Sequence, residues 1–257
     1  MQVRPKKNLG QHFLKDRNIA LKIVDNLQAA DDITVIEVGP GTGIITGFLL
    51  DRFGERLHVV ELDTESADYL DQNFPDLSGR IHQEDFLHLD LRSRFPGKIV
   101  IIGNFPYNIS SQILFRVLEF RKQVIEVVGM FQREVARRIV TGPGSKEYGI
   151  LSVLLAAYYD LGYLFTVSEN VFIPPPKVKS GVIRLIRNNN EQLPCSEDMF
   201  FKVVKMGFNQ RRKTLRNSLS GLILPAYRSN CLLDKRPEQL SVGEFIQLTE
   251  FIEAQTA

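Results

Sequence analysis

Residues 99–112 read IVIIGNFPYNISSQ, and the fold predicted for the chain follows from this segment. It begins with four aliphatic β-branched residues, 99–102, which are typical of a strand buried on both faces of a parallel sheet. Gly103 ends this run. Pro106 stiffens the turn that follows, because its ring fixes its own φ and disfavours helical geometry at Phe105. The segment therefore predicts polar groups at the carboxyl end of a strand, where open α/β sheets bind ligands.

The turn itself, Asn104-Phe105-Pro106-Tyr107, fits a pattern of methyltransferases that modify an exocyclic amino group of a base. Such an amine is a poor nucleophile because its lone pair is conjugated into the ring. Two acceptors on its hydrogens, the Asn104 side-chain oxygen and the Phe105 carbonyl, would favour a tetrahedral nitrogen whose lone pair faces a methyl donor. Tyr107 offers a ring on which the base can stack. An ordinary strand-to-helix turn would explain the tetrapeptide equally well on its own.

Three other predicted strand ends carry groups suited to a nucleoside cofactor. Strand 34–38 leads into Gly39-Pro40-Gly41-Thr42-Gly43, where backbone can approach a ligand closely at a helix N-terminus. Strand 57–60 ends at Glu61, a carboxylate that can accept two hydrogen bonds from a ribose diol. Glu61 lies 22 residues after Gly39, close to the spacing of about 20 expected for such a pair.

The next predicted strand, 80–83, is followed by Asp85 and Phe86. An acid there can accept from an adenine amino group, while the phenyl ring packs on the base. Four successive strand ends thus carry a glycine loop, a ribose acid, an adenine acid and the Asn-Phe-Pro-Tyr turn. This order predicts a nucleoside cofactor facing a base.

Composition limits the class of protein. The chain has 257 residues, 44% of them hydrophobic and 24% charged, as in an ordinary globular protein. We expect no membrane span and no signal peptide, because no apolar run is long enough. Cys195 and Cys231 have no metal-ligand spacing and form no disulfide framework, so a reducing cytoplasm is the simplest setting. The net charge of +2 does not by itself indicate nucleic-acid binding.

The polar segment 188–191 marks a predicted domain boundary, which gives an α/β domain at 1–187 and a helical domain at 188–257. The segment 202–216 contains six cations and no acid, so it is either a solvated face or a surface for a polyanion. The first domain is expected to continue with strand 125–130, a helix at 131–139, a buried helix at 150–159 and closing strands at 165–167 and 179–185. A stiff proline arm, 171–176, lies between the closing strands.

With these residues assembled, the chain resembles the ribosomal RNA adenine N6-dimethyltransferase family, most closely its housekeeping small-subunit type. The likeness runs from Gly10 to about Arg216. Beyond the motifs above, it includes FQREVA at 131–136, PGSKEYG at 143–149, FIPPPKV at 172–178 and QRRKTLRN at 210–217. The resemblance implies a Rossmann-like class I methyltransferase domain, with a mostly parallel sheet and one antiparallel strand, and a small α-helical C-terminal domain that binds RNA.

It also implies dimethylation of two adjacent adenosines in the 3′-terminal hairpin of 16S ribosomal RNA during ribosome assembly. S-adenosylmethionine is the implied methyl donor, and no metal is required. The expected partners are small-subunit RNA and the pre-30S particle, and we expect a cytoplasmic monomer.

The family's motifs assign roles to residues of this chain. Taken with the strand-end residues above, the cofactor set is His12, Leu14, Gly39, Gly41, Glu61, Asp85, Phe86 and Asn104. Phe172 is expected to stack on the target base opposite Tyr107, and the RNA-binding set is Arg211, Arg212, Lys213 and Arg216. The chain departs from the family in three places, with His12 for the common Asn, Phe105 for Leu, and Lys-Ser-Gly at 179–181 for Asp-Ser-Ala.

Three alternatives remain at this point. A nicotinamide-dependent oxidoreductase would share the segment from Gly39 to Glu61, but it would not explain the Asn-Phe-Pro-Tyr turn or the basic segment. A large-subunit RNA methyltransferase that confers macrolide resistance would share both. A ribosome-assembly factor that binds RNA, and whose methylation is incidental, would also fit the sequence.

Overall fold

The computed structural model describes residues 3–30, 32–225 and 229–255. The chain forms two compact units, the first made of Met1–Ala136 and Leu161–Arg187 and the second of Arg137–Asp160 and Asn188–Ala257. The division predicted at residue 187 placed 137–160 in the first domain, whereas these residues group with the second unit. A local reason is the hydrogen bond from Gly144 N to Glu238 O (2.7 Å), which ties this segment to the C-terminal part of the chain.

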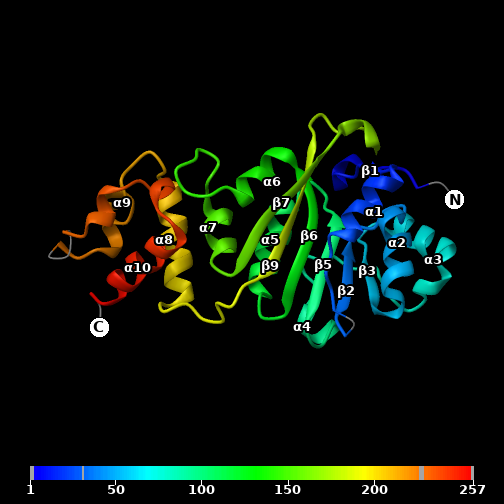
Figure 1. Ribbon diagram of the computed structural model, residues 1–257, viewed down its shortest axis with the longest axis horizontal. Helices are drawn as coiled ribbons and strands as arrows, with labels where there is room; N and C mark the ends of the chain where they lie inside the picture. Colours follow the sequence, from blue (N-terminus) through cyan, green and yellow to red (C-terminus); the bar gives the residue numbers. More distant parts are fainter. Residues whose placement is uncertain (1–2, 31, 226–228, 256–257) are drawn as a thin grey trace. The chain divides into compact units, whose positions relative to one another are not determined.

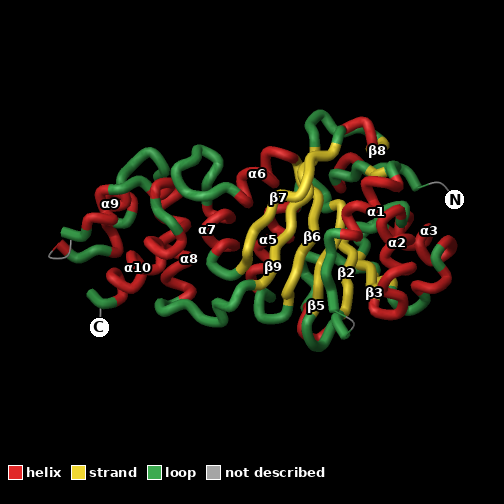
Figure 2. Tube along the Cα trace, viewed as in Figure 1, coloured by secondary structure: helices red, strands yellow, loops and turns green. Residues whose placement is uncertain are grey.

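The first unit is built on a seven-stranded sheet with the order β4-β3-β2-β5-β6-β9-β7 (Figures 1 and 2). Its strands are β2 (Thr34–Val38), β3 (Leu57–Val60), β4 (Ile81–His82), β5 (Ile99–Asn104), β6 (Val124–Gln132), β7 (Tyr159–Val167) and β9 (Ser180–Arg187). The strands from β4 to β6 pair in parallel, and β9 pairs antiparallel to β6. This is the predicted Rossmann-like sheet. Because β2, β3, β4 and β5 are parallel, their carboxyl ends lie along one edge of the sheet.

Helices alternate with the strands along the chain. They are α1 (Arg17–Asp25), α2 (Ile44–Phe53), α3 (Thr64–Asn73), α4 (Leu91–Arg94), α5 (Ser110–Glu119) and α6 (Arg133–Val140). Alternate residues of the central strands, such as Val100 and Ile102 of β5, join Ile23 of α1 and Leu49 of α2 in one buried cluster. Ile101 is equally buried. Because side chains alternate across a strand, Ile101 faces the opposite side, so β5 is covered on both faces.

Two predicted boundaries are wrong in detail. The helix predicted from residue 131 begins at Arg133, because Phe131 still belongs to β6, where it pairs with Gly181. The helix predicted over 150–159 ends earlier, at Ala156, and Tyr159 already begins β7. The apolar run at 150–159 is largely buried, and burial alone does not distinguish helix from strand in a short run.

A second, two-stranded sheet joins the N-terminal segment to the proline arm. In it, β1 (Phe13–Leu14) pairs antiparallel with β8 (Phe172–Ile173), and Lys15 N donates to Val171 O at 2.9 Å. Residues more than 150 positions apart in sequence therefore lie side by side near the N-terminus in Figure 1. The arm was expected to be stiff, and this pairing is one source of its order.

The second unit is helical. It contains α7 (Ile150–Ala156), α8 (Glu197–Asn209), α9 (Leu215–Ser218) and α10 (Val242–Glu253), joined by short 3-10 turns. Phe208 of α8 stacks on Phe245 of α10 with ring centroids 5.9 Å apart, and Tyr148 packs edge-on against Phe208. No helix in the part of the chain that the structure describes is long and apolar enough to cross a membrane.

Two histidines meet at the edge of the main sheet. The Nδ1 atom of His58 on β3 lies 3.0 Å from Nε2 of His82 on β4. Burial, together with the nearby His82 and Arg80, lowers the pKa of His58 to about 4. Burial also lowers the pKa of His82, with Arg94 adding to the effect and Glu84 opposing it. The pair is therefore uncharged at neutral pH.

Acid is expected to destabilise the protein through this pair. Histidines of the unfolded chain take up protons near pH 6.5, whereas folded His58 stays neutral down to about pH 4. The unfolded state thus binds more protons between these values, so the free energy of unfolding falls as the pH drops through this window. Urea denaturation at about pH 7 and about pH 5 should show a smaller loss for His58→Phe than for the wild type. Equal losses in the two proteins would contradict this assignment.

Candidate active site

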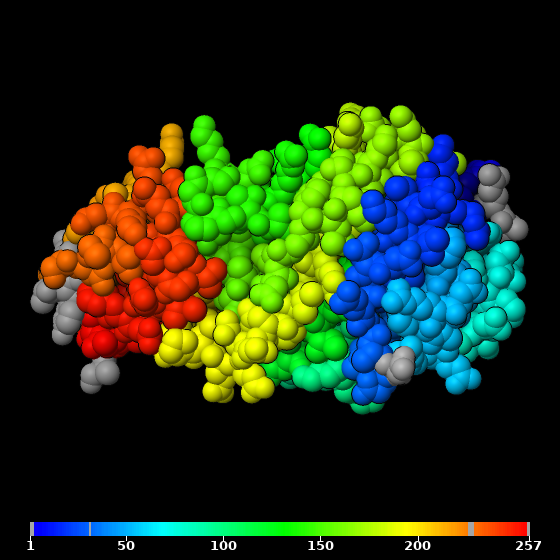
Figure 3. Space-filling model, in the orientation of Figure 1, coloured from blue at the N-terminus to red at the C-terminus, as the bar shows by residue number. Residues whose placement is uncertain are grey.

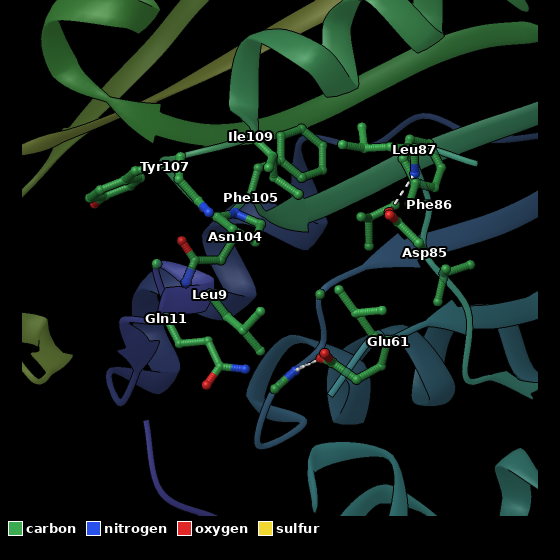
Figure 4. Close-up of a pocket in the computed structure, with 18 of the residues that line it drawn as sticks. Leu9, Gln11, Glu61, Asp85, Phe86, Leu87, Asn104, Phe105, Tyr107 and Ile109 are labelled. Carbon is green, nitrogen blue, oxygen red and sulfur yellow. Dashed lines mark hydrogen bonds between the residues drawn. The ribbon is translucent and has the colours of Figure 1, made fainter. Parts of the chain in front are cut away.

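One pocket opens at the carboxyl edge of the main sheet. It encloses about 870 Å³ of space between protein atoms, part of it open to solvent. Its walls are the ends of β2, β3, β4 and β5 together with the N-terminal segment 9–13. Figure 4 shows Asn104 and Gln11 on one side of the pocket and Glu61 and Asp85 on the other. The sequence predicted the convergence of these strand ends, and the structure places them around one cavity.

Glu61 is held rigidly at the end of β3. One carboxylate oxygen accepts from Gly41 N at 3.2 Å and the other from Asp63 N at 2.9 Å. The side chain is buried, and burial raises the pKa of Glu61 although both backbone hydrogen bonds oppose the rise. Each oxygen keeps a lone pair for a ligand. Glu61 can therefore accept hydrogen bonds from a diol without moving.

The glycine loop lies against the N-terminal segment. Gly41 has a positive φ of 57°, and a Cβ at this position would come within 2.8 Å of the Phe13 ring. The loop thus needs glycine for its backbone geometry and for its contact with Phe13. Elsewhere in the N-terminal segment, Lys6 forms an ion pair with Asp63. These contacts explain why a basic N-terminal segment also contains apolar residues.

Asp85 and Phe86 form the wall that follows β4. The Asp85 carboxylate accepts from Leu87 N at 2.9 Å and lies 2.8 Å from His88 Nδ1. The Phe86 ring lines the pocket but is only 4% exposed, so it supports the wall more than it offers a free face. Leu62, which sequence reasoning missed, is 52% exposed and also lines the pocket. Leu62 therefore offers a flat apolar ligand group more accessible surface than Phe86 does.

Asn104 ends β5 with a defined orientation. Its Nδ2 donates to the backbone carbonyl of His12 at 2.8 Å. The other end of the amide, Oδ1, has no hydrogen-bond partner within the described residues and is available as an acceptor. The turn beyond it is fixed because Phe105 N donates to Met130 O at 3.2 Å. The role of Asn104 Oδ1 as an acceptor for an amino group stays a prediction.

The Phe105 ring is buried below the pocket floor. It packs edge-on against Phe131 at 5.2 Å and lies directly over Gly129 of β6, where an added Cβ would come within 2.4 Å of the ring. Phe at position 105, in place of Leu, is therefore accommodated by Gly129, which leaves the space that the larger ring requires.

Tyr107 lies beyond Asn104, on the side away from Asp85 (Figure 4). Its hydroxyl is 2.6 Å from the Oγ of Ser180, a fully buried residue at the start of β9. Burial raises the pKa of Tyr107, so the hydroxyl keeps its proton at neutral pH. The sequence predicted only a stacking ring here and assigned nothing to Ser180. No local signal could have found this pair, since 73 residues separate its members.

The structure also accounts for Gly181, which replaces an expected Ala. A Cβ at this position would come within 2.8 Å of Ala136 Cβ and of the Tyr163 hydroxyl. Tyr163 occupies space that an alanine side chain would need. Nothing in the structure explains Lys179.

Two predicted site residues do not line the main pocket. Leu14 is buried and borders a smaller cavity beside Gly39 and Asn104. Phe172, expected to stack on a base, is 1% exposed and packs in the core cluster that also contains Leu14. The stacking role assigned to Phe172 is therefore not available in this conformation. Its pairing opposite Leu14 in the two-stranded sheet turns the ring inward.

Glu37 is a further residue that sequence reasoning missed. It borders the same smaller cavity, is 1% exposed, and accepts from Thr46 Oγ1 at 2.6 Å. Burial raises the pKa of Glu37 to about 8. Its signal in the sequence was an acid inside an otherwise apolar strand, immediately before the glycine loop.

The four predicted RNA-binding residues of the second unit differ in their surroundings. Arg211 donates to Ser145 O at 3.0 Å, and Arg216 forms an ion pair with Asp234 at 2.5 Å. Arg212 and Lys213 are exposed, and their charged groups have no ion-pair partner within the described residues. Of the four predicted RNA-binding residues, the middle two, Arg212 and Lys213, are therefore exposed, and the outer two, Arg211 and Arg216, contact other residues of the protein.

A mostly parallel sheet of this order, with a glycine loop, an acid at each of the next two strand ends and an Asn-Phe-Pro-Tyr turn, defines a class I methyltransferase. Comparisons agree with this class. The family model described as ribosomal RNA adenine dimethylase matches residues 3–254. The chain belongs to the ribosomal RNA adenine dimethylase family.

Its curated relatives are similar over nearly the whole chain. It is 59% identical over 250 residues to a ribosomal RNA small subunit methyltransferase A of Parabacteroides distasonis, covering 96% of this chain and 93% of the relative. It is 58% identical over 255 residues to the protein of that name from Flavobacterium johnsoniae, covering 98% and 97%.

Two solved structures share the fold. A dimethyladenosine transferase from Plasmodium falciparum has a TM-score of 0.78 at 22% identity, covering 95% of this chain and 98% of that one. The 23S rRNA methyltransferase ErmE has a TM-score of 0.68 at 26% identity, covering 94% and 99%. The family and the fold support S-adenosylmethionine as the methyl donor.

Removing the Glu61 carboxylate is expected to weaken cofactor binding. Glu61→Ala would leave a ribose hydroxyl without its acceptor, which costs about 1–3 kcal/mol, so affinity should fall roughly tenfold or more. Glu61→Gln keeps one acceptor oxygen near Gly41 and is the matched control, with an intermediate loss. Calorimetric titration with S-adenosylmethionine measures both. Unchanged affinity in Glu61→Ala would remove this residue from the site.

Proposed function

We propose that this protein is an S-adenosylmethionine-dependent adenine N6-dimethyltransferase that modifies two adjacent adenosines in the 3′-terminal hairpin of 16S ribosomal RNA. The observation that carries the proposal is the Asn104 amide. Its Nδ2 is occupied by the His12 carbonyl, so its Oδ1 is left to accept from an amino group beside the pocket.

The residues of the pocket fit the cofactor. The Glu61 carboxylate, fixed by two backbone N–H groups, would hold the ribose hydroxyls, and Asp85 would accept from the adenine amino group. Gly39 and Gly41 would bring backbone close to the remaining part of the molecule. The bound cofactor supplies an electrophilic methyl group. We assign no metal to the reaction.

The protein's own groups then prepare the target nitrogen. Asn104 Oδ1 and the Phe105 carbonyl accept its two hydrogens, which aims the lone pair towards the cofactor side of the pocket. Tyr107 offers its ring to the extruded base, with the hydroxyl held by Ser180. Preorganised acceptors of this kind lower the barrier because they need no rearrangement as charge develops on the nitrogen.

We assign RNA binding to the helical segment 188–257, with Arg212 and Lys213 as direct phosphate contacts. Arg211 and Arg216 belong to the same segment but also hold Ser145 and Asp234. The proposed substrate is the small-subunit RNA within the pre-30S particle, met in the cytoplasm by a single copy of the chain. An assembly role can coexist with catalysis.

Replacing Arg212 and Lys213 with alanine should weaken RNA binding and leave cofactor binding unchanged. For every phosphate that is no longer neutralised, the log–log salt dependence of RNA affinity should flatten by about 0.7–0.9. Lys122→Ala, which removes one exposed cation of the first unit, is the control and should keep the wild-type slope. A double variant with the wild-type slope would show that these charges only face solvent.

The function itself is tested on ribosomes. Small and large ribosomal subunits are prepared from cells that lack ribosomal RNA adenine dimethyltransferases. They are incubated with the protein and S-adenosylmethionine, and N6-dimethyladenosine is mapped by mass spectrometry. We expect two adjacent sites in 16S RNA. Modification of 23S RNA would favour the macrolide-resistance activity, and binding without modification would favour a pure assembly factor.

A further inference from the structure

The imidazole of His12 lies between two parts of the site. Its Nδ1 is 2.8 Å from the carbonyl oxygen of Pro174 in the proline arm. A carbonyl only accepts, so Nδ1 donates, and this fixes the position of the ring proton. The same ring lies against Tyr107, with centroids 5.5 Å apart and planes inclined by 31°. His12 therefore connects the arm to the ring that is proposed to receive the base.

The backbone around His12 is fixed as well. Its carbonyl accepts from Asn104 Nδ2 at 2.8 Å, and the next residue, Phe13, pairs with Ile173 in the two-stranded sheet. Gly10 has a positive φ of 66°, and a Cβ there would come within 2.5 Å of Asn108 Oδ1. The segment from Gly10 to Phe13 is thus fitted closely to the Asn-Phe-Pro-Tyr turn on one side and to the arm on the other.

We propose that His12 is a positioning residue for methyl transfer, which orients the Tyr107 ring by linking it to the Pro174 carbonyl. This role rests on the proposed function and differs from direct cofactor contact. The Tyr107 ring is then located by two contacts, its hydroxyl on Ser180 and its ring against His12. Removal of the His12 imidazole takes away the contact on the Tyr107 ring and leaves the hydroxyl contact with Ser180, so the orientation of the ring is less restricted. Figure 3 shows the N-terminal segment in blue against the chain of the arm in yellow-green, as the role requires.

Three substitutions separate the two contacts of the imidazole. His12→Phe keeps a ring beside Tyr107 but removes the donor to Pro174. His12→Asn keeps a donor at the position of Nδ1 but removes the ring. His12→Ala removes both and leaves the backbone carbonyl that holds Asn104. The rate of single-turnover methylation, at saturating RNA and cofactor, should fall about tenfold in His12→Ala, a size typical of residues in contact. His12→Phe and His12→Asn should each lie between His12→Ala and the wild type.

Two readouts distinguish positioning from other roles. In a Tyr107→Ala background, His12→Ala should cause no further loss of rate, because His12 acts through the Tyr107 ring. RNA with 2-aminopurine at the target position should show less quenching of its fluorescence with His12→Ala than with the wild type, since stacking quenches this base. Affinity for S-adenosylmethionine and the midpoint of thermal unfolding should stay near the wild-type values.

The proposal is overturned by a tenfold loss of cofactor affinity in His12→Ala, which would make His12 a cofactor ligand. It is also overturned if the losses of His12→Ala and Tyr107→Ala add independently, or if either His12→Phe or His12→Asn is no better than His12→Ala. If the wild-type protein itself leaves ribosomal RNA unmodified, the proposed function fails. If the wild type methylates and all three His12 variants match it, only the present proposal fails.

Discussion

Asn104→Ala is expected to lower the rate of methyl transfer about 10²–10³-fold, or some 3–4 kcal/mol in barrier, by analogy with the loss of one preorganised polar group. In the proposed mechanism the amide accepts from the target nitrogen through Oδ1, because Nδ2 is already bound to the His12 carbonyl. Alanine removes both interactions. The measurement is single-turnover methylation of small-subunit RNA at saturating cofactor, with the affinities for RNA and cofactor determined separately.

The neighbouring Asn108 provides the matched control. It belongs to the same turn and lines the same pocket, but it is exposed and has no place in the proposed mechanism. Asn108→Ala should therefore keep most of the rate. If Asn104→Ala transferred methyl groups nearly as fast as the wild type, the catalytic assignment of the Asn-Phe-Pro-Tyr turn would be wrong. If it reduced binding of cofactor in the same proportion as rate, Asn104 would act through its expected cofactor contact and not as an acceptor for the amine.

Arg184→Ala is expected to lower the free energy of unfolding by about 3 kcal/mol, because breaking a buried ion pair leaves an unpaired charge behind. Arg184 Nε on β9 lies 2.7 Å from Glu126 Oε1 on β6, and the Glu126 side chain is only 6% exposed. Glu126 also accepts from Gln28 N at 3.0 Å, which keeps the carboxylate partly satisfied. The pair joins the antiparallel strand to the parallel part of the sheet.

Two further variants test this explanation in urea denaturation. Replacing both charges, as Glu126→Gln with Arg184→Met, should recover much of the loss, because the uncompensated charge is gone while Gln28 keeps its acceptor. Arg94→Ala breaks an exposed ion pair, in which the Arg94 side chain is 44% exposed and the Glu84 side chain 37%. It should lower the free energy of unfolding by no more than about 1 kcal/mol. Equal costs for Arg184→Ala and Arg94→Ala would contradict the dependence on burial.

Local patterns in the amino-acid sequence were enough to predict the elements that build the site. The apolar run before Gly103 predicted β5. The spacing from Gly39 to Glu61 predicted a glycine loop and an acid on neighbouring strands. Because parallel strands joined by helices end at one edge of a sheet, the order of these motifs was enough to predict that Glu61, Asp85 and Asn104 share a pocket.

The side chains that those residues meet depend on tertiary packing alone. Phe172 and Tyr107 are both aromatic residues near prolines, yet one is buried opposite Leu14 and the other lines the pocket. Arg211 and Arg212 are adjacent cations, yet only Arg211 reaches Ser145. Ser180 meets Tyr107 across 73 residues of chain, and the imidazole of His12 meets Pro174 across 162. Such contacts follow from how strands pair and helices pack, and local periodicity carries no information about side chains that meet from distant parts of the chain.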